Sequence, residues 1–391
     1  MTWRDNWRVL VAETLTGQIL ADVVPKTMPT FTRALTDTGA WGVDVLIGAF
    51  ANSTVDFHAY TRPGKYSWII AHGNYIVQAG PVTTYQFDDA TSTLSVSGSG
   101  LLGVFDHRVV RNPVGSANDP VAAIVNESED LTYAGLSLPG IAAALIRDNL
   151  TQPGFALPLE VPEPGQGQAE RTYYGYELAT VWDRVSTLAE VIGGPELDCE
   201  PYFVPGENQI AWRLHLGAPL LGDQNTTAVW DYGGALGSIN IDVNGADTPA
   251  ARVWVKGDGS EREMLTGFAE DTSLTAGGYP PVDYVDGDHT SVTEQDTLEG
   301  YADHDLADRR WASESWACSV RVDGMAGDTE ASPQLGSWSL GDAPTFYVDN
   351  HPWLPDGGYR RRITGYGDDG ADHVALTLAE TAETGLGGGD A

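Results

Sequence analysis

Hydrophobic and polar residues alternate through most of the first 110 positions, which is the period-two pattern of strands with one buried face. This pattern predicts strands at residues 7–12, 18–24, 43–48, 66–71, 75–79, 82–87 and 94–97. The segment His72-Gly73-Asn74 separates two of them and is typical of a hairpin loop. So many short strands in a row favour a barrel or a sandwich.

The middle of the chain changes to a helical period. Ser137-Leu138-Pro139-Gly140 opens a predicted helix that runs to Leu150, because proline is tolerated in a first turn. A second helix is predicted from Glu177 to Ile192, ended by Gly193-Gly194-Pro195. Its apolar residues form one stripe at helical spacing: Leu178, Val181, Trp182, Val185, Leu188, Ala189 and Ile192.

Further strands are predicted around two loop-like stretches. The strand patterns cover residues 199–204, 209–216, 250–256, 316–322, 345–348, 359–366 and 373–378. Proline and glycine over 152–167, and an acidic composition over 277–290, predict exposed loops. Thr293 with Asp296 predicts the start of a helix that reaches about Trp311.

These elements predict a mainly β protein with an α+β middle, in which two β-barrel-like domains flank a mixed α/β domain. The predicted boundaries are 1–112 for the N-terminal barrel, 113–235 for the mixed domain and 236–380 for the C-terminal barrel-like domain with one helix. Residues 381–391 are glycine-rich and predict a flexible tail.

The charge balance narrows the possible partners. Asp and Glu number 55 against 21 Lys and Arg, a formal net charge of −34. Coding bias in a GC-rich genome or salt adaptation would explain this composition, and a functional use of the acidity is the alternative. A field of that sign repels phosphates, so we expect no stable nucleic-acid binding and no membrane anchoring. Two distant cysteines, Cys199 and Cys318, are too few for a disulfide framework or a thiolate zinc site.

A literal dinucleotide fingerprint, Gly98-x-Gly100-x-x-Gly103, follows a predicted strand. Nucleotide binding would require a helix and then an acidic residue about 20 positions on. The residues that follow, 104–110, look like another strand or a bend, with Pro113 soon after. Glycines at a strand bend are the better interpretation.

Two acidic clusters are candidate metal sites. His304 and Asp308, with Asp303 and Asp305, could face a metal from one helix, but a solvated acidic face explains them more simply. The loop residues Asp283, Asp286, Asp288 and His289 miss the EF-hand spacing, and Ca²⁺ binding by 283–289 stays open.

Catalytic signatures are missing from the sequence. It contains no G-x-S-x-G, H-E-x-x-H or C-x-x-C motif, and its eight histidines are scattered. A glycan hydrolase that uses an Asp/Glu pair remains an alternative. We expect no enzyme, no catalytic residues, no cofactor and no bound metal.

One basic run stands out in this acidic chain. Arg360, Arg361 and Arg362 lie in a predicted strand, on which Arg360 and Arg362 share one face and Arg361 takes the other. We expect at least one of them to contact a carboxylate of another domain or subunit.

Several segments together resemble minor tail proteins of actinobacterial siphophages, in particular their tail-tip baseplate hub. The resemblance rests on residues 7–23, 34–48, 75–82, 97–105 with Arg108, and 178–198. In the last third it rests on 340–342, 347–348, 362–366 and 374–378.

This resemblance implies a homotrimeric hub that closes the tail tube with a ring of six pseudo-equivalent barrels. Its partners would be the distal tail protein, the tape measure and fibre or receptor-binding proteins, with DNA only passing through. The location would be the tail tip of the virion, after synthesis in the host cytoplasm. The alternatives are the distal tail ring protein or a host-glycan-binding tail protein.

Overall fold

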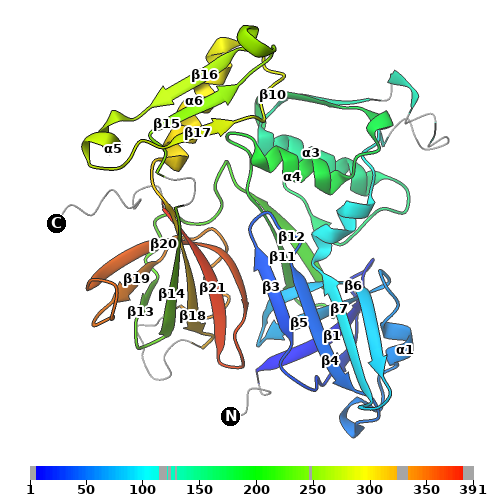
Figure 1. Cartoon of the computed structure of the whole chain (residues 1–391). Helices are drawn as coiled ribbons and strands as arrows, with labels where there is room; N and C mark the ends of the chain where they lie inside the picture. Colours follow the sequence, from blue (N-terminus) through cyan, green and yellow to red (C-terminus); the bar gives the residue numbers. More distant parts are fainter. Residues whose placement is uncertain are drawn as a thin grey trace. The chain divides into compact units, whose positions relative to one another are not determined.

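The computed structural model describes residues 6–113, 121, 125–127, 130–245, 249–323 and 333–381 (Figure 1). The chain is mainly β, as predicted. It divides into two compact units. Unit 1 holds the described residues up to Ser238 together with Ser319–Tyr359 and Ile363–Leu376. Unit 2 holds the described residues of Ile239–Cys318, Arg360–Arg362 and Thr377–Thr381.

The first part of unit 1 is a sheet of antiparallel strands. They are β1 (Trp7–Glu13), β2 (Ile19–Val23), β3 (Thr30–Ala34), β4 (Ala40–Leu46), β5 (Tyr66–His72), β6 (Tyr75–Asp88) and β7 (Thr93–Ser99). Their order in the sheet is β3-β4-β7-β6-β5-β1-β2. Gly73 and Asn74 connect β5 to β6, and Gly73 has a φ of 58°, which favours glycine. The short helix α1 (Phe57–Tyr60) precedes β5.

The second part of unit 1 mixes helices and short sheets. Strands β8 (Leu131–Leu136) and β10 (Gln166–Tyr173) pair with each other. Strands β11 (Leu197–Phe203) and β12 (Ile210–Leu216) form an antiparallel hairpin, which the short β9 (Leu159–Glu160) joins in parallel. Helices α3 (Leu138–Thr151) and α4 (Val181–Glu190) share one buried cluster with these strands, centred on Ile141, Leu145, Val185, Leu197 and Leu214.

A further group of strands follows. These are β13 (Val229–Asp231), β14 (Leu236–Asn244), β18 (Ser313–Arg321), β19 (Thr345–Val348), β20 (Gly357–Asp368) and β21 (His373–Glu380). In unit 1, Gly365–Gly367 of β20 pairs with Thr32–Ala34 of β3, so the N-terminal sheet continues into this group. Strands β14, β18, β20 and β21 each lie partly in unit 1 and partly in unit 2.

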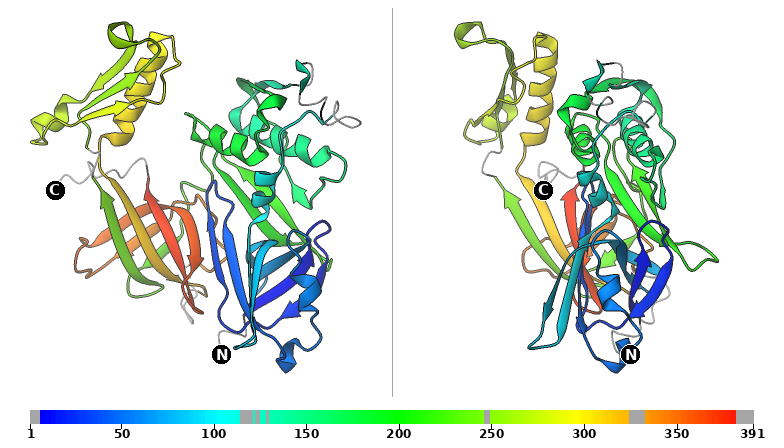
Figure 2. Two further views of the ribbon diagram at one scale, coloured as in Figure 1. Left: turned by 45° about the vertical axis from the view of Figure 1, so that its right-hand side comes forward. Right: turned by 90° about the vertical axis from the view of Figure 1, so that its right-hand side faces the viewer.

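Unit 2 also contains a small two-layer structure. Strand β15 (Arg252–Lys256) pairs antiparallel with β16 (Thr266–Glu270) and parallel with β17 (Asp283–Asp286). Helix α6 (Gln295–Arg309) lies along one face of this sheet (Figures 1 and 2). Leu298 and Ala302 of the helix pack on Val253, Val255 and Ala269. The short α5 (Thr272–Ala276) follows β16.

The predicted long helix is shorter than its apolar stripe. Helix α4 begins after Thr180, whose hydroxyl accepts a hydrogen bond from the Asp183 amide, and it ends at Glu190. Leu178 has a left-handed backbone, with φ of 51°, and its side chain is exposed, as is that of Ile192. The buried stripe is therefore Val181, Val185 and Leu188, and the prediction was wrong at both ends.

Other boundaries also differ from the prediction. Helix α6 has Glu294 before its first residue and no side-chain cap, so Thr293 is not the N-cap. The acidic loop 277–290 contains strand β17, and residues 75–79 and 82–87 belong to one continuous strand, β6. The helix at 138–151 and the β5–β6 and β11–β12 hairpins are confirmed.

The predicted domain boundaries and the predicted flexible tail are not tested by the described residues. The domain boundaries at 112/113 and 235/236 remain predictions. The flexible tail lies, from residue 382 on, outside the described residues. None of the described helices combines the length and the apolar character that crossing a bilayer requires.

Candidate functional site: a buried ion pair and the groove beside it

A buried arginine joins three segments of unit 1 that are far apart in sequence. On β3 the residues alternate between exposed and buried, which places Arg33 on the same buried face as Phe31. Its guanidinium donates two hydrogen bonds to Asp198 of β11, Nε to Oδ1 at 2.8 Å and Nη2 to Oδ2 at 2.7 Å. Arg33 is 6% and Asp198 8% exposed, so the pair is withdrawn from water.

Two tyrosines complete this junction. Arg33 Nη1 donates to the Tyr366 hydroxyl of β20 at 3.2 Å, and that hydroxyl donates to the Val77 carbonyl of β6 at 3.1 Å. The Tyr75 and Tyr366 hydroxyls lie 3.3 Å apart. Burial raises the pKa of both tyrosines. For Arg33, burial alone would lower the pKa, but the Asp198 carboxylate together with the Tyr366 and Tyr75 hydroxyls outweighs it and holds the pKa well above its ordinary value. We name this set the Arg33 junction.

A small cavity of about 200 Å³ opens beside the Arg33 junction. Its lining includes Arg33, Tyr75, Asp198 and Tyr366, and also Glu200 with His215. His215 Nε2 lies 2.9 Å from Glu200 Oε2. This hydrogen bond, aided by nearby arginines, lowers the pKa of Glu200 despite partial burial.

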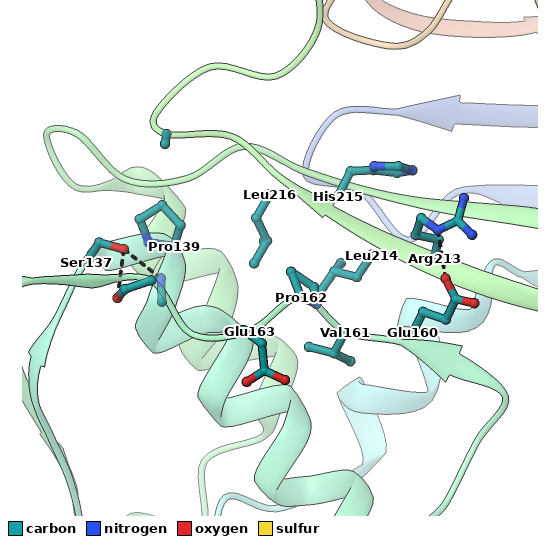
Figure 3. Close-up of a pocket in the computed structure, with 13 residues that line it drawn as sticks. Ser137, Pro139, Glu160, Val161, Pro162, Glu163, Arg213, Leu214, His215 and Leu216 are labelled. Atoms are coloured by element: carbon teal, nitrogen blue, oxygen red, sulfur yellow. Dashed lines mark hydrogen bonds and ion pairs between the residues drawn. The ribbon is translucent and has the colours of Figure 1, made fainter.

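A larger groove of about 590 Å³ is lined by residues of β12 and of the segment around β9 (Figure 3). His215 lines both hollows. Val161, Pro162, Leu214 and Leu216 give the groove an apolar floor, and Figure 3 shows Glu160 and Arg213 together at one end. Arg213 Nε donates to Glu160 Oε2 at 2.8 Å, so the charges at that end are paired.

Ser137 lies at the opposite end of this groove (Figure 3). Its hydroxyl accepts a hydrogen bond from the Gly140 amide at 3.1 Å and donates to the Gly165 carbonyl at 3.3 Å, so it caps helix α3. His215, the histidine that lines the groove, contacts Glu200 and not the Ser137 hydroxyl. The groove therefore offers a shaped apolar surface with paired charges at its rim, and no contact between a nucleophile and a base.

The arginine run lies on β20, with Arg361 in the interior of unit 2. Arg361 is 4% exposed, its Nη2 donates to Glu314 Oε1 of β18 at 2.6 Å, and its guanidinium lies 4.7 Å from the Trp316 ring centroid. Arg362 is also buried and Arg360 is partly exposed. Arg361 thus contacts a carboxylate of its own unit, and a contact of this run with another subunit or domain stays a prediction.

Residues of the two acidic clusters contact one another or a neighbouring arginine. Asp286 contacts His289 at 3.1 Å, and Asp283 contacts Arg252 at 2.9 Å. His304 lies 3.5 Å from Asp308 on α6. Among the described residues, no group of three or more His, Cys, Asp or Glu side chains is placed to hold a metal ion.

The first two glycines of the motif, Gly98 and Gly100, lie at points of close backbone approach, as the strand-bend interpretation predicts. A Cβ on Gly98 would lie 2.1 Å from the Pro81 carbonyl oxygen, and one on Gly100 would lie 2.4 Å from that of Thr38. These positions need glycine because backbones approach closely there. The segment that follows is a 3₁₀ helix, Leu101–His107, rather than the expected strand or bend.

The cysteines are both unpaired thiols. Burial raises the pKa of Cys318 to about 12 and raises that of Cys199 as well. Both groups are therefore protonated and unreactive near neutral pH.

Sequence reasoning missed Arg33 as well as its strand. The signal was present in Thr30-Phe31-Thr32-Arg33-Ala34, where an arginine occupies an alternate position otherwise taken by an apolar side chain. Its partner Asp198 is 165 residues away, which no local pattern could indicate.

The antiparallel sheet with its α/β part and its second strand group is similar in fold to solved phage tail proteins. No family model matches the sequence, and no curated protein matches it. The chain is similar in structure to the 43 kDa tail protein of prophage MuSo2 from Shewanella oneidensis, with TM-score 0.58 and 14% identity over 96% of this chain and 98% of that one.

Two further solved structures agree. A tail protein from Neisseria meningitidis MC58 has TM-score 0.53 and 14% identity over 96% of this chain and 97% of that one. Prophage tail protein gp18 from Listeria monocytogenes EGD-e has TM-score 0.50 and 10% identity over 96% and 95%. At these identities the likeness establishes the fold.

Proposed function

We propose that this chain is a structural component of a phage tail, acting as the hub at the tail tip of a siphophage. The observation that carries the proposal is the full-length likeness of fold. Three phage tail proteins match 96% of the chain, and each is itself matched over 95–98% of its length. A likeness that covers nearly the whole chain indicates a shared architecture rather than one common module.

The contacts inside unit 1 suit a load-bearing role. A protein that closes a tube has to hold its parts in fixed positions while DNA and neighbouring proteins act on it. The Arg33 junction ties β3, β6, β11 and β20 together through charged and hydroxyl groups that are shielded from water. Breaking a buried pair of this kind leaves an uncompensated charge, so the arrangement resists separation.

The net charge of −34 supports the passage of DNA. Carboxylates facing a lumen repel phosphates, so DNA would cross without binding. In this proposal three copies form the hub, with barrel-like domains at 1–112 and 236–380 and the mixed domain 113–235 between them. Arg360, which is partly exposed, is the arginine of the run that we assign to a carboxylate of another subunit.

The test is to locate and count the chain in purified particles. Quantitative mass spectrometry should find it in virions at three copies per tail, and gold-labelled antibody should mark the tail tip. Six copies would favour the distal tail ring protein instead. Absence from the particle would overturn both versions.

Subunit contacts are tested on the purified chain. Mass photometry should detect trimers, and Arg360→Gln should shift them toward monomers most strongly at low protein concentration. Lys256→Gln, a change of equal charge on β15, is the matched control. Equal assembly of the two variants at every salt concentration would remove Arg360 from the interface.

A further inference from the structure

Strand β6 changes partners halfway along its length. Its first half pairs with β5, from His72↔Tyr75 to Ser67↔Pro81. Its second half pairs on the opposite side with β7, from Val82↔Gly98 to Asp88↔Thr93. Among the described residues, no strand pairs with the other side of residues 83–88. This outer side of β6 is named the free edge, and the β6–β7 hairpin that bears it can be followed in Figure 2.

The free edge carries apolar side chains that the chain leaves uncovered. Tyr85 lies opposite Val96, and Phe87 lies opposite Leu94. Val96 and Leu94 are buried, whereas Tyr85 is 53% and Phe87 49% exposed. Residues directly opposite in an antiparallel pair point to the same face. The core face of the sheet therefore continues onto β6, where Tyr85 and Phe87 are only half covered. One more strand beside β6 would cover them.

The free edge has few of the features that protect edge strands: the irregularity in its pairing with β7 lies at its start, between Val82 and Thr84, and its charged residue, Asp88, lies at its end. Proteins commonly place lysine, proline or a covering loop at such an edge to prevent further pairing. Thr83-Thr84-Tyr85-Gln86-Phe87-Asp88 contains neither lysine nor proline. The covering contact from residues 62–65 ends at Val82, whose carbonyl accepts a hydrogen bond from the Gly64 amide.

The charges select the kind of strand that fits. Asp88 and Asp89 lie at the outer end of the hairpin and are exposed. Lys26, the basic side chain near this end, donates to the Thr93 hydroxyl of β7 and acts on the Asp88 carboxylate, so two carboxylates here face one amine. The chain as a whole carries a net charge of −34. A cationic segment is favoured by both the local and the overall charge.

We propose that the free edge binds an extended, cationic segment of another tail protein by strand addition. Main-chain hydrogen bonds to residues 83–88 would supply register, and apolar side chains at alternate positions of the segment would cover Tyr85 and Phe87. A basic side chain would lie near Asp88 and Asp89. This inference rests on the proposed function, because it names the chemistry of one partner of the tail component.

Hydrogen exchange of the full chain tests the proposal, with an acetylated and amidated peptide of four Lys-Val repeats as the probe. In an antiparallel pair only alternate amides bond to the neighbouring strand, so the outward amides of 83–88 exchange freely in the chain alone. The peptide should slow them at least tenfold. The same peptide with proline at two alternate positions, or with Glu in place of Lys, should leave them unchanged.

Variants on the two faces of the strand distinguish specific docking from non-specific binding. Tyr85→Ser with Phe87→Ser should weaken binding of the Lys-Val peptide at least fivefold. Thr84→Ser with Gln86→Ser, on the opposite face of the same strand, should change it less than twofold. Asp88→Asn with Asp89→Asn should weaken binding and reduce its dependence on salt.

Three outcomes would overturn the inference. The peptide could leave the amides of 83–88 unprotected, the Glu-Val peptide could protect them equally, or they could already be slow in the chain alone. The last result would mean that this chain or a second copy covers the edge. The count of the chain in virions is independent of all three, so a chain present at the tail tip with an inert edge would leave the proposed function standing.

Discussion

Two buried arginine–carboxylate pairs, one in each unit, differ in how far apart their partners lie in the sequence. In unit 2, Arg361 and Glu314 come from β20 and β18 and are 47 residues apart. In unit 1, Arg33 and Asp198 are 165 residues apart, and the same guanidinium also bonds to Tyr366. Arg361 belongs to the conspicuous basic run, whereas Arg33 is a single arginine within an apolar pattern. The residue that connects most of the chain was the less noticeable of the two.

Both pairs are buried, so each should be costly to break from one side. A removed partner leaves a charge without compensation, which matters more than the attraction that is lost. The difference lies in what each break would loosen. Loss of Arg33 affects segments from the whole length of unit 1, while loss of Arg361 affects neighbouring strands of unit 2.

The largest expected effect is that of Arg33→Ala. Stranding Asp198 in the interior should lower the free energy of unfolding by about 3–5 kcal/mol. Urea unfolding measures the loss, and hydrogen exchange should show faster opening of β3, β11 and β20 together. Arg8→Ala, which breaks the exposed contact with Asp22, should cost at most about 1 kcal/mol. Equal losses for the two variants would show that the junction is not load-bearing.

Arg361→Ala should cost about 3 kcal/mol, because Glu314 is left buried and the contact with Trp316 is lost. The comparison predicts that faster exchange is confined to β18, β20 and their neighbours in unit 2. Faster exchange of β11 at the same time would mean that the two pairs are coupled, contrary to this account. Arg321→Ala, at an exposed pair with Asp323, provides the control.

Trp182→Ala measures the loss of apolar packing, without any change of charge, in unit 1. A fully buried tryptophan would cost about 3–5 kcal/mol, but Trp182 is only partly buried against the α3–α4 cluster, so about 2 kcal/mol is expected. The shift of the thermal midpoint checks this. A loss as large as that of Arg33→Ala would mean that apolar packing contributes as much to unit 1 as the ion pair.

The smallest expected effect is pH-dependent. The hydrogen bond from His215 lowers the pKa of Glu200 in the folded chain from its ordinary value of 4.5. Its contribution is therefore present above pH 4.5 and is lost as the pH falls through the lowered folded value. Glu200→Gln should cost about 1 kcal/mol at pH 7 and almost nothing well below pH 4.5. Thermal midpoints at both pH values test this, and a pH-independent difference would contradict it.

Local patterns predicted the elements whose ends are fixed by nearby residues. Helix α3 begins where Ser137 and Pro139 indicate, because its cap needs only the Gly140 amide three residues on. The β5–β6 hairpin follows from Gly73, and β19 has the predicted bounds Thr345–Val348. Helix α4 was overextended because Leu178 and Ile192 continue its spacing, whereas the Thr180 cap and the end at Glu190 limit the helix.

The sequence by itself determined the fold class. Period-two patterns at both ends and helical stripes between them required a mainly β chain with an α/β part, since only those elements bury such faces. The tertiary structure alone decided which polar groups meet. The Arg33–Asp198 contact depends on β3 and β11 lying together, and the free edge of β6 depends on where β5 ends and β7 begins. Such contacts arise from the pairing of distant strands. The local spacing of residues along the chain does not specify which strands pair.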